Sequence, residues 1–384
     1  MSKLSASLRE FYGTNDFVAL HEPKFTELTS KYVNECIDTG WVSSAGRFVS
    51  EFEHKVSAFT NAKHAIAVSS GTAALHLSLL AAGVKHDDEV ICPNITFVAS
   101  ANAISYLGAS PHLVDVALDD MCIDCDKLED HLSSVADLTK DGCVNKITGK
   151  RIAAILVVHA FGFAADLHRL FRICELYNLK LVEDAACAIG SKSDGHYIGA
   201  DSEFAAFSFN GNKLVTGGNG GLVLTRDDEI YHKIKHLSTT AKQIHRWEYI
   251  HDEVGYNYRM TNLSAAILVS QIENLDETLR RKRLLFNEYE AIFKKYDWLE
   301  LIKEKKLVES NYWLFCVKIN EPSDTSLEDI LYELNEANIM ARPLWRPISL
   351  LKPYLKAPRG DLSNSYKLYQ QVFNIPSSPQ LLRQ

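Results

Sequence analysis

Short apolar runs alternate with helix-like stretches between about residues 60 and 225, and this alternation restricts the possible folds more than any other feature of the chain. Turn residues bound each apolar run, as they commonly bound buried strands. Seven strands are expected, over HAIAVSS (64–70), EVICP (89–93), PHLVDV (111–116), IAAILVVHAF (152–161), LKLVEDAA (179–186), FAAFSF (204–209) and GGLVLT (220–225). The alternation predicts an α/β fold with a mainly parallel sheet covered by helices, in which ligands bind at the carboxyl ends of the strands.

The pattern changes after about residue 255. A long helical pattern over 262–296 is followed by a strand-like segment, 311–319, and by a second helical pattern, 326–338. Such a mixture predicts a smaller α+β domain. The expected division of the chain is an N-terminal arm (1–30), a large domain (31–250) that includes a polar surface segment at 126–151, and a small C-terminal domain (251–384).

Charge and composition exclude several classes of function. The net charge of −8, without a basic stripe, argues against a nucleic-acid partner. No stretch of about 18 or more apolar residues is present and the N-terminus has no apolar signal core, so we expect a cytoplasmic protein without a membrane span. Cys122 and Cys125 have a zinc-like spacing but lack a second such pair, so we expect no metal site and free thiols throughout.

The stretch SSGTAA (69–74) lies where the first strand becomes a helix. Gly71 permits a tight turn, and the N–H groups of Gly71, Thr72 and Ala73 would face one point with the helix dipole behind them. Such a junction is suited to phosphate. The alternative is an ordinary helix start that is capped by Ser70 or Thr72.

Two adjacent carboxylates end a later strand, in VEDAA (182–186). Glu183 and Asp184 alternate in direction, so only one of them faces a given pocket. A carboxylate at such a place needs a cationic partner or strong donors, and a protonated pyridine nitrogen is one fitting partner. Capping of the next helix by Asp184 is the alternative.

A single lysine, Lys213, lies between an apolar strand and a glycine cluster in FSFNGNKLVTGGNGG (207–221). A lysine is a nucleophile only as the free amine, a form that burial near positive charge or condensation with an aldehyde favours. A surface lysine in a glycine-rich turn is the alternative. The phosphate site, the carboxylate and the lysine together match the phosphate, ring nitrogen and aldehyde of pyridoxal phosphate.

A set of motifs in a fixed order then carries a resemblance to a known family: SSGTAALHL, TFVASANAI, VEDAACAIGS, SFNGNK and GYNYRMTNLSAAI. Over nearly its whole length the chain resembles the sugar aminotransferases of the DegT/DnrJ group, which have the aspartate-aminotransferase (type I) fold with a seven-stranded sheet. SFNGNK, TTAKQIHRWEYIHDEVGYNYRM and RPLWRP are similar to a narrower branch that makes 4-amino sugars such as UDP-N-acetylbacillosamine precursors.

The resemblance implies a role for each matching residue. Lys213 would hold pyridoxal phosphate as an aldimine, and Asp184 would pair with its ring nitrogen. Further cofactor contacts are implied for Gly71, Thr72, Ala73 and Ser208 at the phosphate, Phe97 on the ring, Cys187 at a position often held by Gln or His, and Asn257 from the neighbouring subunit of a homodimer. Arg259 would lie near the substrate.

A nucleotide diphosphate needs cationic partners on the protein. The candidates are Lys242, His245, Arg246 and Arg346. For the two arginines, stacking on the adjacent Trp247 and Trp345 is the alternative.

The resemblance implies transfer of an amino group from glutamate to the C4 keto carbon of a UDP-linked 6-deoxy-N-acetylhexosamine, with ping-pong kinetics. The alternative substrates are a C3 keto sugar and a dTDP- or GDP-linked sugar. Sugar dehydration goes with histidine in place of Lys213, and a non-catalytic sugar-nucleotide-binding regulator would lose Lys213 or Asp184. A lysine aldolase without cofactor would lack the SSGTAA phosphate site, so amino transfer is favoured.

Overall fold

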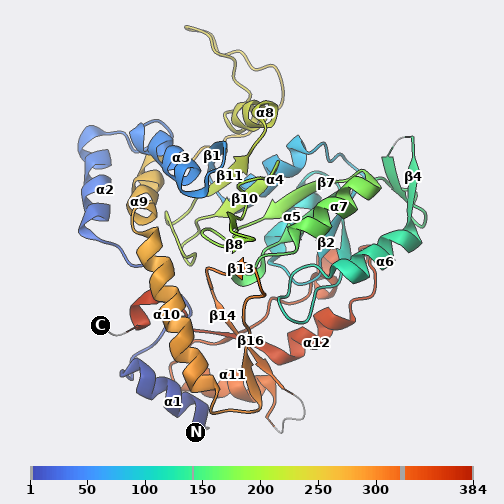
Figure 1. Ribbon diagram of the computed structural model, residues 1–384. Coiled ribbons are helices and arrows are strands. Elements are labelled where there is room, and N and C mark those ends of the chain that lie inside the picture. Colours follow the sequence, from blue (N-terminus) through green and yellow to red (C-terminus); the bar gives the residue numbers. More distant parts are fainter. Residues whose placement is uncertain (1–2, 141, 321–324, 383–384) are drawn as a thin grey trace.

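A seven-stranded sheet lies at the centre of the computed structural model, which describes residues 3–140, 142–320 and 325–382 (Figure 1). The strand order is β1-β11-β10-β7-β6-β2-β3, and β11 is the strand that runs against the others. The strands are β1 (His64–Val68), β2 (Glu89–Pro93), β3 (Ser110–Val114), β6 (Ile152–Val158), β7 (Lys180–Asp184), β10 (Ala205–Ser208) and β11 (Gly221–Thr225). Each overlaps one predicted run, so the mainly parallel seven-stranded sheet is confirmed.

Each side of this sheet has its own hydrophobic core, because successive strand residues face opposite sides. In β6, Ile155 and Val157 belong to one core, whereas Leu156 and Val158 belong to the other. The helices that cover the sheet are α3 (Arg47–Thr60), α4 (Gly71–Ala81), α5 (Val98–Tyr106), α7 (Leu167–Tyr177) and α8 (Asp228–Ser238). Side-chain caps define where α4, α7 and α8 begin.

The predicted polar surface segment contains regular structure that the sequence analysis did not foresee. Helix α6 (Cys125–Val135) is followed by a hairpin of β4 (Ala136–Thr139) and β5 (Gly142–Asn145). The helix buries Leu128 and Leu132 on one face. These apolar positions are four residues apart, and the polar residues between them obscure the helical pattern.

The long helical pattern near the start of the C-terminal part forms two helices rather than one. Helix α9 (Asn262–Ile272) packs against α3 and α2 (Glu27–Thr39), and α10 (Leu275–Phe293) follows it. Asn274 separates α9 from α10 with a backbone φ of −109° and ψ of 11°. Asparagine favours such non-helical positions because its side chain competes for backbone hydrogen bonds.

A four-stranded sheet with the order β12-β14-β16-β15 forms the core of the C-terminal part. Its strands and helices are β12 (Leu299–Leu301), β14 (Phe315–Ile319), β15 (Arg342–Pro343), β16 (Val372–Ile375), α11 (Leu327–Glu336) and α12 (Ser363–Gln371). The first helix, α1 (Lys3–Tyr12), lies beside α10 in Figure 1, and the hydroxyls of Tyr12 and Tyr289 are 2.7 Å apart. The N-terminal segment thus packs against the C-terminal part.

Short elements connect these larger units. In a three-stranded sheet, β13 (Val308–Glu309) pairs with β8 (Lys192–Ser193), which also pairs with β9 (His196–Tyr197). The 3₁₀ turns among the described residues are η1 (Ala160–Gly162), η2 (Ile348–Leu350), η3 (Lys352–Tyr354) and η4 (Pro379–Leu381). Within the described ranges, the helices fall short of the length or hydropathy that a membrane crossing requires.

Candidate active site

A cavity of about 320 Å³ lies at the carboxyl ends of β7 and β10, beside the first turn of α4. This is the edge of the sheet at which the sequence predicts ligand binding. Seven of the predicted site residues line this cavity: Gly71, Thr72, Phe97, Asp184, Cys187, Ser208 and Lys213. Phe97 lines the cavity and is 57% exposed.

The first turn of α4 approaches β10 closely, and Gly71 makes this approach possible. A Cβ atom at Gly71 would lie 2.6 Å from the Cβ of Ser208. The glycine is therefore needed for space, rather than for the tight turn that the sequence suggested. Ser70 Oγ accepts a hydrogen bond from the N–H of Ala73 at 3.1 Å, so the predicted cap is present and Ala73 itself does not line the cavity.

Asp184 ends β7 with a buried carboxylate, 5% exposed, that faces the cavity. Ser100 Oγ donates to Asp184 Oδ2 at 2.7 Å, and the N–H of Ala186 donates to Asp184 Oδ1 at 3.1 Å. Burial nevertheless raises the pKa of Asp184 above its ordinary value. A cationic ring nitrogen in the cavity would offset this cost, because an opposite charge stabilises a buried carboxylate.

The neighbouring Glu183 points to the other side of the strand, as the alternation predicts. His159 Nε2 lies 3.1 Å from Glu183 Oε2, and Ser202 Oγ donates to Glu183 Oε1. The structure therefore separates the two carboxylates into one that faces the cavity and one that is satisfied within the protein. The bond from Ala186 to Asp184 closes a turn rather than the first turn of a helix, so Asp184 is not a helix cap.

Lys213 directs its amine into the same cavity, where both of its close contacts are uncharged groups. Lys213 Nζ lies 3.2 Å from Cys187 Sγ and 3.7 Å from the ring centre of Trp313. Burial raises the pKa of the Cys187 thiol, which keeps it in the neutral form. Lys213 therefore lies in a pocket, and the alternative of a solvated surface lysine does not hold.

These residues fit pyridoxal phosphate. Within the described part of the chain, no cationic side chain pairs with the buried carboxylate of Asp184 as a protonated ring nitrogen would. Gly71, Thr72 and Ser208 bring a helix N-terminus and two hydroxyls together, where a phosphate is favourable. Lys213 would supply the amine for the aldehyde.

Six other predicted residues lie away from this cavity: Lys242, His245, Arg246, Asn257, Arg259 and Arg346. The first three lie on the segment that projects from the body beyond α8 in Figure 1. All six are exposed, and the guanidinium of Arg246 lies 5.7 Å from the ring centre of Trp247, as the stacking alternative predicts. Within this single chain, none of the six meets Lys213.

Two tryptophans complete the cavity. Trp313 was not identified from the sequence, and Trp345 was considered there only as a stacking partner of Arg346. Trp313 lies under the amine of Lys213, and its Nε1–H donates to the carbonyl of Asn212 at 2.8 Å. Trp345 stacks on Phe161 with ring centres 4.2 Å apart. Both come from the C-terminal part of the chain, and an isolated tryptophan near a strand carries no local signal of a distant pocket.

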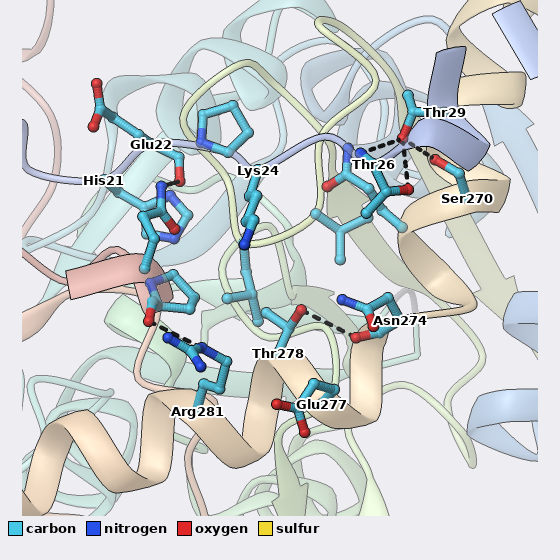
Figure 2. A pocket seen from close by; sticks show the side chains of 16 residues that line it. His21, Glu22, Lys24, Thr26, Thr29, Ser270, Asn274, Glu277, Thr278 and Arg281 are labelled. Atoms are coloured by element: carbon cyan, nitrogen blue, oxygen red, sulfur yellow. Dashed lines mark hydrogen bonds between the residues drawn. The ribbon is translucent and has the colours of Figure 1, made fainter. Parts of the chain in front are cut away.

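A second cavity of about 340 Å³ includes Leu214 and Val215, the two residues that follow Lys213, in its wall (Figure 2). Some of its polar groups contact one another: Thr29 Oγ1 lies 2.8 Å from Ser270 Oγ, and Arg281 donates to the carbonyl of Pro379 at 3.2 Å. It contains neither Lys213 nor Asp184. The chemistry therefore belongs to the first cavity.

Comparison with known proteins identifies the relatives of the chain. A model described as the DegT/DnrJ/EryC1/StrS aminotransferase family matches residues 23–384. The chain is 36% identical to a GDP-perosamine synthase of Escherichia coli O157:H7 over 371 residues, which are 95% of this chain and 94% of that protein. It is 32% identical over 333 residues, 86% of this chain and 82% of the relative, to EpsN of Bacillus subtilis, whose name describes a pyridoxal phosphate-dependent aminotransferase.

A solved structure agrees with these relatives. The crystal structure of S. venezuelae DesV in complex with a ketimine intermediate is similar with a TM-score of 0.82 and 28% identity, over 96% of this chain and 95% of DesV. The fold is thus that of the type I aminotransferases, as the sequence predicts. The cofactor is pyridoxal phosphate, and the reaction is amino transfer to a sugar. The chain belongs to the DegT/DnrJ/EryC1/StrS aminotransferase family.

Proposed function

We propose that this chain transfers the amino group of glutamate to the C4 keto carbon of a GDP-linked keto sugar. The observation that carries the proposal is the placement of the Lys213 amine and the buried Asp184 carboxylate in the wall of one cavity. The relative at 36% identity is named for a GDP-linked amino sugar, which supports GDP as the carrier. The UDP-linked branch expected from the motifs lacks such support, so the GDP-linked alternative replaces it.

The roles of the side chains follow from their placement. When bound, pyridoxal phosphate supplies an aldehyde and an electron-accepting ring. Asp184 keeps the ring nitrogen protonated by charge pairing, while Thr72 and Ser208 hold the phosphate end. Lys213 Nζ takes a proton from the amino-acid donor and returns one to the sugar product, since its amine lies in the wall of the cavity.

We further propose that the active unit is a homodimer. Asn257 and Arg259 lie next to one another on the exposed segment that precedes α9, with Arg259 Nη2 3.5 Å from Asn257 Oδ1. The projecting segment beyond α8 also exposes Trp247 and Val254. In a two-fold dimer, such segments can reach the cavity of the partner, where Lys242, His245 and Arg246 would meet the nucleotide.

An absorption experiment tests the proposed reaction. The protein loaded with pyridoxal phosphate should lose its cofactor band near about 410–430 nm when glutamate is added, since the amino group passes to the cofactor. A GDP-linked 4-keto sugar should then restore the band, and mass spectrometry should detect the amino sugar. Restoration by the UDP-linked N-acetyl sugar alone would replace the substrate assignment, and no response to glutamate would contradict amino transfer.

A further inference from the structure

The amine of Lys213 is held between two side chains that come from distant parts of the sequence. Cys187 follows β7, and its Sγ lies 3.2 Å from Lys213 Nζ. Trp313 precedes β14, and its ring centre lies 3.7 Å from the same nitrogen. A cation over the face of an indole is stabilised by the ring quadrupole, so the Trp313 ring favours the ammonium form of this lysine.

Trp313 is fixed in place through each of its own polar groups. Its backbone N–H donates to Asn311 Oδ1 at 2.8 Å, and its indole N–H donates to the carbonyl of Asn212 at 2.8 Å. Its carbonyl accepts hydrogen bonds from Ser377 Oγ at 2.7 Å and from Lys282 Nζ at 3.1 Å. The indole therefore has little freedom to move away from the amine.

Asn311 connects Trp313 to Cys187, the residue whose thiol is the second contact of the Lys213 amine. Its side-chain amide donates to the carbonyls of Cys187 and Ile189, at 2.9 Å each. Its Oδ1 accepts from the N–H of Trp313, and the residue is 2% exposed. A Cβ atom on Gly162 would lie 2.0 Å from Asn311 Oδ1, so this position has room for glycine alone.

We propose that Trp313 stabilises the protonated amine of Lys213 and that Asn311 positions both Trp313 and Cys187 around it. The inference rests on the proposed role of Lys213 as the group that moves the proton. When the amine takes a proton, the positive charge develops above the indole face, where it is favourable. Asn311 acts through the two residues that it holds and is therefore a positioning residue.

Competitive acetylation of the full-length, cofactor-free protein tests this inference. The rate of acetylation of Lys213 by acetic anhydride is measured against pH, by mass spectrometry of the peptide that contains it. Loss of the indole in Trp313→Leu should move the midpoint of this profile to lower pH by roughly 0.5–1 unit. Trp313→Phe should move it less, since phenylalanine keeps a weaker ring face. Asn311→Ala should move it in the same direction.

Trp345→Leu is the matched control, because it enlarges the same cavity without removing the ring under the amine. Its midpoint should remain that of the wild type. An unchanged midpoint in Trp313→Leu, or an equal shift in Trp345→Leu, overturns the inference. If Trp313→Leu does not fold, the comparison of Trp313→Phe with Trp345→Phe decides.

The response of the loaded wild-type protein to glutamate separates this inference from the proposed function. A midpoint that shifts in Trp313→Leu, in a protein that does not react with glutamate, would support the contact and contradict the proposed reaction. A protein that reacts with glutamate but shows no shift retains the proposed function and loses the role of Trp313.

Discussion

At the scale of single residues, the directions of two adjacent carboxylates at the end of β7 determine which of them faces the cavity. Asp184 turns into the cavity with two hydrogen-bond donors and a pKa that burial raises. Glu183, one residue earlier, turns away to His159 and Ser202. The two side chains are both carboxylates but lie in different surroundings, because consecutive strand residues face opposite sides of the sheet.

Asp184→Asn should retain the fold but reduce turnover by roughly 10²–10³-fold. The amide cannot supply the negative charge that keeps the ring nitrogen protonated. Turnover with glutamate and the keto sugar is compared with that of Glu183→Gln, which alters the carboxylate outside the cavity. A larger loss in Glu183→Gln than in Asp184→Asn would contradict the assignment of Asp184.

Lys213→Ala should still bind pyridoxal phosphate, because Asp184 remains and so do Gly71, Thr72 and Ser208 at the proposed phosphate site. It should show no measurable turnover. Cofactor binding is followed by absorption and turnover by formation of 2-oxoglutarate. Appreciable turnover in this variant would contradict the role of the lysine amine.

Gly71→Ala should weaken cofactor binding and lower stability by about 1–3 kcal/mol, because the added methyl meets the Cβ of Ser208 at 2.6 Å. The equilibrium dissociation constant of the cofactor and the Tm are the measurements. Gly211→Ala is the control for stability, since its nearest non-neighbouring atom would lie at 3.8 Å. Equal stability losses in the two variants would rule out the close approach as the cause.

At the level of elements, α6 is attached to the edge of the sheet through titratable groups, of which Glu89 and His112 are buried and His131 is half-buried. Glu89 in β2 lies 2.8 Å from His112 Nδ1 in β3, and His112 Nε2 lies 2.7 Å from His131 Nε2 in α6. Burial, together with the neighbouring His112, lowers the pKa of His131 to about 4. The folded protein therefore resists protonation of this histidine.

Acid should weaken the protein through His131. The unfolded chain takes up this proton near pH 6.5, whereas the folded chain does so only near pH 4. The contribution of neutral His131 to the free energy of unfolding is fully present above about pH 6.5. The free energy of unfolding should fall by about 1–2 kcal/mol as the pH drops toward 4. The Tm at pH 7 and pH 5 is compared between wild type and His131→Gln. An identical pH dependence in the two proteins would contradict the prediction.

At the scale of the whole molecule, the cavity unites distant parts of the chain, and the remaining predicted residues lie outside it. Trp313 and Trp345 come from the C-terminal part, whereas Gly71 and Asp184 come from the central sheet. Asn257 and the projecting segment beyond α8 remain exposed. A second copy of the chain is therefore the proposed source of the missing contacts.

Mixing Lys213→Ala with Asn257→Ala, each of which is expected to lose activity by itself, tests this arrangement. Lys213→Ala and Asn257→Ala, unfolded and refolded together in equal amounts, should regain roughly a quarter of the wild-type activity. Half of the dimers would be mixed, and each mixed dimer would contain one site with both native residues. Refolding of each variant alone is the control. No recovery in the mixture would show that Lys213 and Asn257 do not act across subunits.

The amino-acid sequence by itself determined the seven strands of the large sheet and the three groups that fit the cofactor. Strand alternation and strand-end motifs are local patterns, so a short window contains the whole signal. Gly71, Asp184 and Lys213 each follow such a pattern, which explains why all three line the same cavity at the predicted edge of the sheet.

The tertiary structure alone decided the direction of β11, the break before α10 and the surroundings of the lysine amine. Cys187 and Trp313 contact Lys213, and Asn311 contacts Cys187, across more than 20 residues of sequence in each case. No local periodicity encodes such pairs. The polar segment at 240–252 likewise projects from this chain, although its cationic residues were predicted to bind a nucleotide diphosphate. Local sequence sets which elements form, while packing between distant elements sets which side chains meet.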